Sequence, residues 1–147
     1  MFRRILVPID GSELSNEALK AAVRLAEENG AAIIALNVQP VYRPPVVAEV
    51  PVADIYSQEE YEAGALQVAD KVLADASALA AAASVPCKTV AQLDASPWEA
   101  IIRVAREEGC DLIFMASHGR RGVAGLLLGS ETQKVLTHCK IPVLVHR

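Results

Sequence analysis

Short runs of mostly apolar residues alternate with segments of helical periodicity along the 147-residue chain. Such runs are typical of strands that are covered on both faces of a parallel sheet. The runs that we expect to be strands are residues 5–9, 31–38, 85–91, 111–116 and 141–145. The segments that we expect to be helices are residues 14–28, 59–83, 97–108 and 130–138. The third strand is half polar and is therefore expected at an edge of the sheet.

This alternation predicts an α/β fold in which one parallel sheet lies between two layers of helices, a three-layer sandwich. No composition shift or repeat divides the chain, so residues 1–147 are expected to form a single domain. Ligands of such sheets bind beyond the carboxyl ends of the strands, where the winding direction reverses. If the first strand is central, the reversal brings residues 10–12 next to the glycine-rich segment after the fourth strand.

The composition excludes several other classes of protein. Hydrophobic residues make up 52% of the chain and charged residues 22%, which is typical of a folded domain rather than a disordered chain. The net charge of −4 leaves no basic excess for nucleic-acid binding. No apolar run approaches the roughly 20 residues that a membrane-spanning helix needs. The first ten residues lack the features of a signal peptide, so we expect a cytoplasmic protein.

The cysteines and histidines give no metal-ligand pattern. Cys87, Cys110 and Cys139 are widely spaced, with no Cys-x-x-Cys pair, and are expected to be free thiols. We therefore predict no metal site. His118 adjoins the glycine-rich segment and is either a nucleotide contact or a solvated loop histidine.

Two segments are expected to begin helices with a serine cap. Ser96 precedes Pro97, with a glutamate three residues after the serine, and residues 130–133 fit a capping box that begins at Ser130. The proline-rich connection 39–57 precedes the second helix. It is either a functional cover or partner contact, or a plain insertion.

The glycine-rich segment 115–130 has features of a phosphate-binding loop. It runs from a strand end to a helix N-terminus, where unpaired backbone N–H groups attract anions. Arg120 and Arg121 add positive charge, or serve only solubility, and Ser130 adds a hydroxyl. The alternative is a structural loop in which the glycines permit tight turns and Ser130 caps the helix.

Several known sites are absent from the sequence. It contains neither a P-loop nor a Gly-x-Gly-x-x-Gly after the first strand, so P-loop NTPases and NAD-dependent dehydrogenases are unsupported. A Gly-x-Ser-x-Gly elbow is also missing. No catalytic residue is evident, so we expect that the protein is not an enzyme.

The chain resembles the universal stress protein family along nearly its whole length. The resemblance is carried in this order by residues 5–12, 110–115, 117–122, 126–130 and 141–145. It implies a fold like that of the adenine nucleotide alpha hydrolases, with a five-stranded parallel sheet of order 3-2-1-4-5. It also implies a homodimer in stress response and, in one branch, an ATP site. We expect ATP to be the ligand, with Mg²⁺ as its companion ion, and at most slow incidental ATP hydrolysis.

That branch has the pattern Gly-x-x-Gly-x(9)-Gly-Ser/Thr. Here Gly119, Gly129 and Ser130 match it, whereas Ala116 replaces its first glycine and Glu131 replaces a commonly apolar residue. The resemblance implies contacts to ribose and adenine from the strand ends and contacts to phosphates from the loop and helix. The residues concerned are Asp10, Val38, Met115, Ala116, Gly119, Gly129, Ser130 and Thr132.

Alternatives remain for these positions. Asp10 is a turn or capping residue in the competing interpretation, and Val38 and Met115 are ordinary core residues. The apolar final strand, if it lies at an edge, predicts antiparallel pairing of Val143–Val145 with a second copy; otherwise the connection 39–57 covers it. The competing function is a nucleotide-free dimeric interaction module of the same fold, which Ala116 and Glu131 favour.

Overall fold

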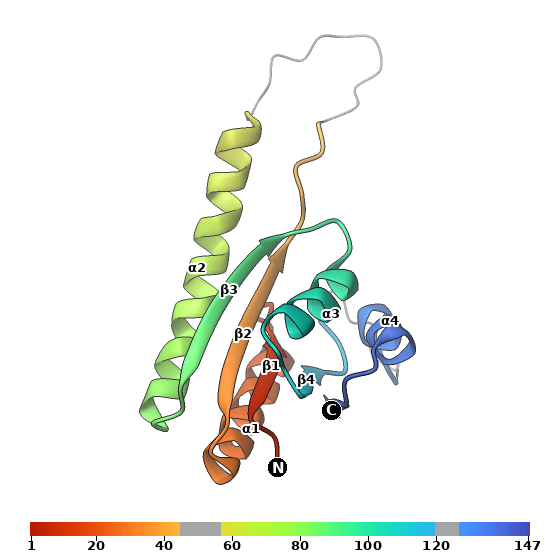
Figure 1. The fold of residues 1–147 in the computed structure, drawn as a ribbon. Coiled ribbons are helices and arrows are strands. Elements are labelled where there is room, and N and C mark those ends of the chain that lie inside the picture. The colour runs from red at the N-terminus through yellow and green to blue at the C-terminus, as the bar shows by residue number, and fades with distance from the viewer. Residues whose placement is uncertain (45–56, 120–126) are drawn as a thin grey trace.

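The computed structural model describes residues 1–44, 57–119 and 127–147. Its strands form one parallel sheet in the order β3-β2-β1-β4-β5 (Figure 1). They are β1 (Arg4–Pro8), β2 (Ala32–Gln39), β3 (Cys87–Leu93), β4 (Leu112–Ala116) and β5 (Val143–His146). This order confirms the fold class and strand order expected from the sequence. The half-polar strand β3 lies at an edge, as predicted.

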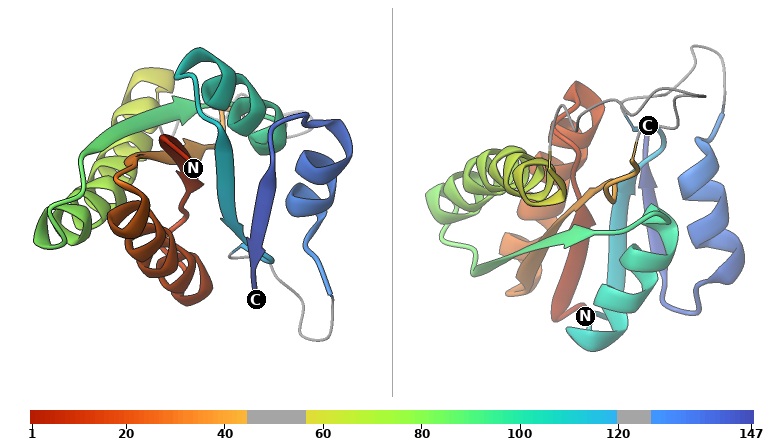
Figure 2. Two further views of the ribbon diagram at one scale, coloured as in Figure 1. Left: turned by 60° about the horizontal axis from the view of Figure 1, so that its bottom comes forward. Right: turned by 90° about the horizontal axis from the view of Figure 1, so that it is seen from above.

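Helices cover both faces of the sheet (Figure 2). They are α1 (Glu13–Asn29), α2 (Gln58–Ala82), α3 (Pro97–Glu107) and α4 (Ser130–His138). One core cluster joins the sheet to α1 and α2, and we call it the α1/α2 core; the other joins the sheet to α3 and α4, the α3/α4 core. Characteristic members of the first are Ile5, Val7, Leu19 and Leu73, and of the second Leu6, Ile101, Val104 and Val135.

Strand β1 explains why its sequence is apolar at consecutive positions. Ile5 and Val7 belong to the α1/α2 core, whereas Leu6 between them belongs to the α3/α4 core. Because successive side chains of a strand point to opposite faces, a strand covered on both sides needs apolar residues throughout. All three residues are fully buried.

The ends of the helices differ from the prediction at two places. Ser96 stands at the N-cap of α3, but its side chain makes no capping hydrogen bond. Ser130 is the first residue of α4, and Gly129 occupies the N-cap position. The predicted N-cap position of Ser96 and the first helical position of Pro97 are confirmed, but the Ser96 side chain does not cap the helix, and the predicted cap at Ser130 is wrong. At α3 the reason is tertiary, because a carboxylate from α4, described below, takes the place of the serine.

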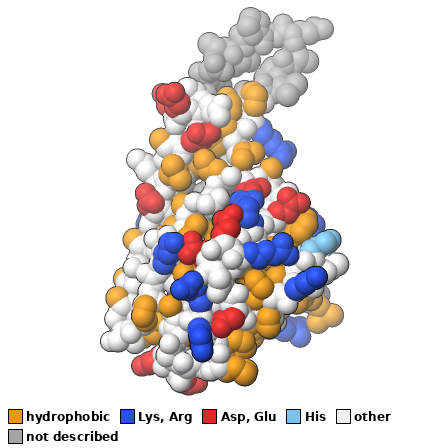
Figure 3. Space-filling model, viewed as in Figure 1, with side chains coloured by type: hydrophobic (Ala, Val, Ile, Leu, Met, Phe, Trp, Pro, Cys, Tyr) orange, Lys and Arg blue, Asp and Glu red, His pale blue; other side chains and the backbone are white. Residues whose placement is uncertain are grey.

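Most of the long connection between β2 and α2, residues 45–56, lies outside the described residues. At its described ends, the Tyr61 hydroxyl donates to the Pro40 carbonyl (3.2 Å), and the rings of Tyr42 and Tyr61 lie 5.5 Å apart. The described parts of the chain contain no helix that is long and apolar enough to cross a membrane. On the face drawn in Figure 3, lysine and arginine side chains are interspersed with aspartate and glutamate.

Candidate functional site

The carboxyl ends of β1 and β4 bring the two predicted loops into contact. A Cβ atom built on Gly119, after β4, would lie only 2.8 Å from the Asp10 Oδ2 atom, after β1. The chain runs from β1 to β3 toward one edge and from β4 to β5 toward the other, so this is where the winding reverses. The expected meeting of these loops is confirmed.

Asp10 is held in a turn that leads into α1. Its Oδ1 atom accepts a hydrogen bond from the Ser12 backbone N–H (2.9 Å), and its own N–H donates to the Ser15 hydroxyl (3.1 Å). Gly11 has a φ of 80°, which favours glycine, and the Ser12 hydroxyl caps α1. One carboxylate oxygen thus serves the turn, while the other faces Gly119.

Asn37 is a residue of this site that the sequence analysis missed. It lies in β2 with an exposed fraction of only 1%. Its Nδ2 atom donates to the Ile9 carbonyl (2.8 Å), and its Oδ1 atom accepts from the Gln39 side chain (2.7 Å). Asn37 therefore anchors the backbone next to Asp10. A single polar residue within an otherwise apolar run was the signal that could have identified it.

The start of α4 is tied to the end of β4. The Gly129 N–H donates to the Ser117 carbonyl (2.7 Å). The Thr132 hydroxyl, which is buried, donates to the carbonyls of Ala116 (3.1 Å) and Ser117 (3.2 Å). These bonds occupy the Thr132 hydroxyl, so its backbone N–H is the group that remains for a phosphate contact.

Gly129 is required by space rather than by its backbone angles, since its φ of −69° suits any residue. A Cβ atom there would lie 3.1 Å from the Ser117 carbonyl oxygen and 3.4 Å from the His118 Cα atom. The glycine therefore lets α4 begin in close contact with the end of β4.

The first turn of α4 presents backbone donors to any anion beyond the strand ends. The N–H groups of Ser130, Glu131 and Thr132 precede the first intrahelical hydrogen bond, which runs from Gln133 N–H to the Gly129 carbonyl (3.0 Å). The Ser130 side chain is exposed. Such a helix end carries partial positive charge and binds phosphate or carboxylate groups.

Glu131 directs its carboxylate to a neighbouring helix. Its Oε2 atom accepts a hydrogen bond from the Trp98 backbone N–H (2.9 Å) at the start of α3, and the Lys134 ammonium lies 3.4 Å from its Oε1 atom. This carboxylate is therefore the cap of α3 that Ser96 was expected to supply. The Trp98 N–H engages one oxygen and the Lys134 ammonium lies near the other, which reduces the repulsion between this carboxylate and an anion at α4.

The remaining predicted residues contribute mainly to packing. Met115 is buried in the α3/α4 core, and half-buried Val38 packs against it. The methyl group of Ala116 is buried in the α1/α2 core. The side chains of Met115 and Ala116 are thus core groups. Arg120 and Arg121, the expected cationic residues, lie outside the described residues.

His118 is half-buried beside Gly129. Its Nδ1 atom lies 2.9 Å from the Ser117 hydroxyl. Its Nε2 atom is enclosed and has no hydrogen-bond partner among the described residues. The alternative of a solvated imidazole is therefore wrong for the Nε2 atom of His118. Buried polar atoms are nearly always paired, so an unpaired one marks a position that needs explanation.

No group of three or more His, Cys, Asp or Glu side chains able to hold a metal ion occurs within residues 1–44, 57–119 and 127–147. The cysteines are free thiols, as predicted. Burial raises the pKa of the Cys110 thiol to about 11 and also raises the pKa of Cys87. Both thiols are therefore poor nucleophiles at neutral pH.

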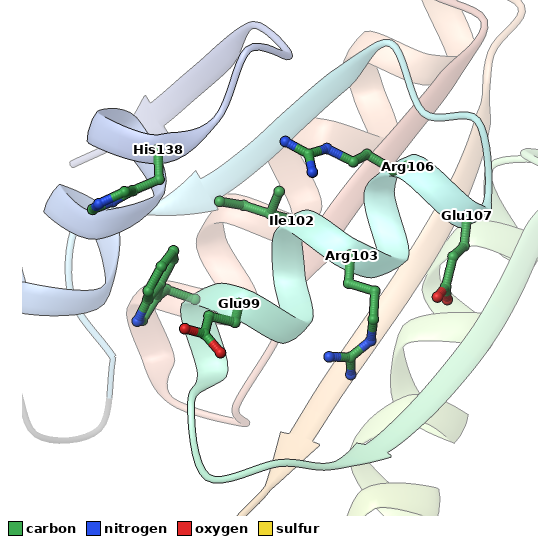
Figure 4. Close-up of a pocket in the computed structure, with 7 residues that line it drawn as sticks. Glu99, Ile102, Arg103, Arg106, Glu107 and His138 are labelled. Carbon is green, nitrogen blue, oxygen red and sulfur yellow. The ribbon is translucent and has the colours of Figure 1, made fainter.

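A separate hollow of about 540 Å³ lies on the outer side of α3, next to the end of α4 (Figure 4). The Trp98 and His138 rings stack within it, with centroids 4.6 Å apart. Ile102 also lines the hollow, and the remaining lining residues carry charges of both signs: Glu99, Arg103, Arg106 and Glu107. None of the predicted site residues lines this hollow.

Comparison with known proteins agrees with this architecture. The model of the universal stress protein family matches residues 1–147. A universal stress protein of Thermus aquaticus, encoded in the QAH/OAS sulfhydrylase 3′ region, is 34% identical over 150 aligned residues, which cover 100% of both chains.

Solved structures of this family share the fold. The universal stress protein UspA from Lactobacillus plantarum superposes with a TM-score of 0.82 at 25% identity, covering 99% of this chain and 97% of that one. A universal stress protein in complex with cAMP superposes with a TM-score of 0.71 at 26% identity, covering 99% and 97%. With the family model matching every residue, the chain belongs to the universal stress protein family.

Proposed function

We propose that this protein binds an adenine nucleotide, with ATP as the leading candidate, at the carboxyl ends of β1 and β4. The observation that carries the proposal is the close approach of Gly119 to Asp10, beside the start of α4, whose first backbone N–H groups have no partner within the helix. An added Cβ atom would meet Asp10 at position 119 and the Ser117 carbonyl at position 129, so these two glycines let the loop and the start of α4 lie close to the strand ends.

Each part of the nucleotide has a matching group in this chain. The N–H groups of Ser130, Glu131 and Thr132, with the Ser130 hydroxyl, would hold the phosphates. The Asp10 carboxylate would accept hydrogen bonds from the ribose hydroxyls. Val38, at the end of β2, would line the adenine pocket.

The two departures from the family pattern do not oppose binding. The Glu131 carboxylate is engaged by the Trp98 N–H at 2.9 Å. The Ala116 methyl is buried in the α1/α2 core, where it adds packing rather than bulk at the helix end. In the sequence, Ala116 and Glu131 favoured a nucleotide-free interaction module. Their surroundings in the structure weaken that argument.

A similar protein gives further support. The universal stress protein solved in complex with cAMP is 26% identical to this chain over 99% of its length. An adenine nucleotide is thus a ligand of a protein that shares this fold and more than a quarter of its residues.

The proposed role is that of a binding module in the stress response, acting in the cytoplasm. Hydrolysis of ATP, if it occurs, would be slow and incidental, because the sequence contains no evident general base. When bound with ATP, Mg²⁺ would neutralise phosphate charge, held by the phosphates rather than by a cluster of carboxylates among the described residues. The protein would act as a homodimer in which Val143–Val145 pairs with the same segment of a second copy.

Calorimetric titration of Mg²⁺-ATP tests this proposal. We expect wild type to bind with a Kd on the order of micromolar, and Gly129→Asp to lose the binding because the new side chain meets the Ser117 carbonyl. Gly64→Asp is the matched control, since a Cβ on Gly64 meets nothing within 4 Å. Absence of heat with wild type would contradict the proposal and favour the nucleotide-free interaction module.

A further inference from the structure

The imidazole of His118 has one nitrogen in use and one without a partner. Its Nδ1 atom lies 2.9 Å from the Ser117 hydroxyl. Its Nε2 atom is buried and makes no hydrogen bond with any described residue. Removing a polar group from water without supplying a partner is unfavourable, so the unliganded site retains an unmet requirement at Nε2.

The ring lies against the beginning of α4. A Cβ atom on Gly129 would be 3.9 Å from the His118 Cδ2 atom, which is bonded to Nε2. The Gly129 N–H is occupied by the Ser117 carbonyl, whereas the next three N–H groups of the chain open the helix. The edge of the ring that carries Nε2 is therefore adjacent to the anion-binding end of α4.

The hydrogen bond to Ser117 bears on the position of the imidazole proton. When the Ser117 hydroxyl donates to Nδ1, the neutral ring carries its proton on Nε2 and becomes a donor there. A donor at this place suits phosphate oxygens, which only accept hydrogen bonds. Ser117 is itself fixed, because its N–H donates to the His146 carbonyl (2.7 Å) in β5.

We propose that His118 is a phosphate-binding residue whose Nε2–H donates to the phosphate chain and sets the preference of the site for nucleotides over nucleosides. This inference rests on the proposed nucleotide site and adds a side chain to its backbone donors. A phosphate oxygen that displaces the atoms enclosing Nε2 would supply the partner that Nε2 lacks.

Titrations with ATP, ADP, AMP and adenosine, on wild type and two variants, test the proposal. His118→Asn retains a polar group near Nδ1 but loses the donor at Nε2, whereas the longer amide of His118→Gln returns a donor near Nε2. For His118→Asn we expect ATP affinity to fall roughly tenfold or more and adenosine affinity to stay unchanged. For His118→Gln we expect ATP affinity within about threefold of wild type.

Each other outcome has a distinct meaning. Unchanged ATP affinity in His118→Asn, or an equal loss for ATP and adenosine, would overturn the role of His118 while the nucleotide site stands. Failure of wild type to bind any of the four compounds would overturn the site and this inference together.

A measurement on wild type covers the case in which the variants fail to fold. Nitrogen-15 NMR of the imidazole should show a change at His118 Nε2 on addition of ATP and none on addition of adenosine. An Nε2 signal that ATP leaves in place would contradict the proposal.

Discussion

The carboxylate of Asp10 and the backbone of Gly119 are in such close contact that an added carbon at position 119 would force the carboxylate or the loop to shift. The Cβ of an alanine at position 119 would lie 2.8 Å from Asp10 Oδ2. The φ of Gly119 is not positive, so an alanine would suffer from this contact rather than from backbone strain. The glycine brings the loop after β4 against the end of β1, and the proposed site depends on that approach.

We therefore expect Gly119→Ala to destabilise the protein by about 1–2 kcal/mol through overpacking. In the Asp10→Ala background the same change should cost less than about 0.5 kcal/mol, because the obstructing oxygen is gone. Urea unfolding of the four proteins measures this coupling. Equal costs in both backgrounds would show that Asp10 is not what Gly119 accommodates.

Glu131 links α4 to α3, and its removal should weaken that link. Glu131→Ala leaves the Trp98 N–H without its acceptor and should cost about 1 kcal/mol, the usual effect of losing a helix cap. Glu131→Gln keeps an acceptor oxygen and should cost less. The fluorescence of Trp98, the single tryptophan of the chain, follows unfolding directly.

Glu99→Ala is the control for that series. Glu99 lies in the first turn of α3, next to Trp98, and its side chain is exposed. Its loss should therefore change stability by no more than about 0.5 kcal/mol. A Glu131→Ala variant no less stable than Glu99→Ala would argue against the capping role.

Asp94 makes stability depend on pH in the acidic range. The Ser96 N–H donates to its Oδ1 atom (2.8 Å) and Arg103 lies 3.0 Å from Oδ2; the Ser96 hydrogen bond, aided by Arg103, lowers the pKa of this carboxyl. A carboxyl whose pKa is lower in the folded state stabilises the fold above its unfolded pKa. That contribution is lost as the pH falls through the folded pKa.

We accordingly expect the unfolding free energy of wild type to exceed that of Asp94→Asn by a constant amount from pH 7 to pH 5. The difference should shrink below about pH 4, the ordinary pKa of an aspartate. Urea unfolding of both proteins between pH 3 and pH 7 measures it. A difference that persists undiminished at pH 3 would contradict the assignment.

The edge strand β5 should carry the proposed homodimer. Its Leu144 has an exposed fraction of 38%, and an arginine there would place charge at the strand that pairs with its copy. We expect wild type to sediment as a dimer and Leu144→Arg as a monomer. Leu66→Arg, at a position on α2 that is 41% exposed, should remain dimeric. A monomeric wild type, or a dimeric Leu144→Arg, would refute pairing through β5.

The fold could be predicted because its determinants are local. The apolar residues of β1 are buried on both faces, and the alternation of strands with helices leaves few ways to arrange one parallel sheet. The meeting of Asp10 with Gly119 followed from the same topology. No residue-level contact was needed to predict it.

The errors concern contacts between elements distant in the sequence. Ser96 has the local signature of a cap, but the acceptor at α3 comes from Glu131, 33 positions beyond Trp98. Asn37 interrupts an apolar run because its side chain donates a hydrogen bond to the Ile9 carbonyl, just beyond the end of β1. The enclosure of the His118 Nε2 atom depends on where α4 begins relative to the end of β4. Such partners are decided by packing, which periodicity does not encode.

A crystal structure of the protein grown with ATP and Mg²⁺ tests the central claim most directly. We predict electron density for the phosphates at the N–H groups of Ser130, Glu131 and Thr132, with the ribose hydroxyls at Asp10. A nucleotide bound in the Trp98–His138 hollow instead, or strand ends that remain empty or filled by neighbouring side chains, would contradict the account.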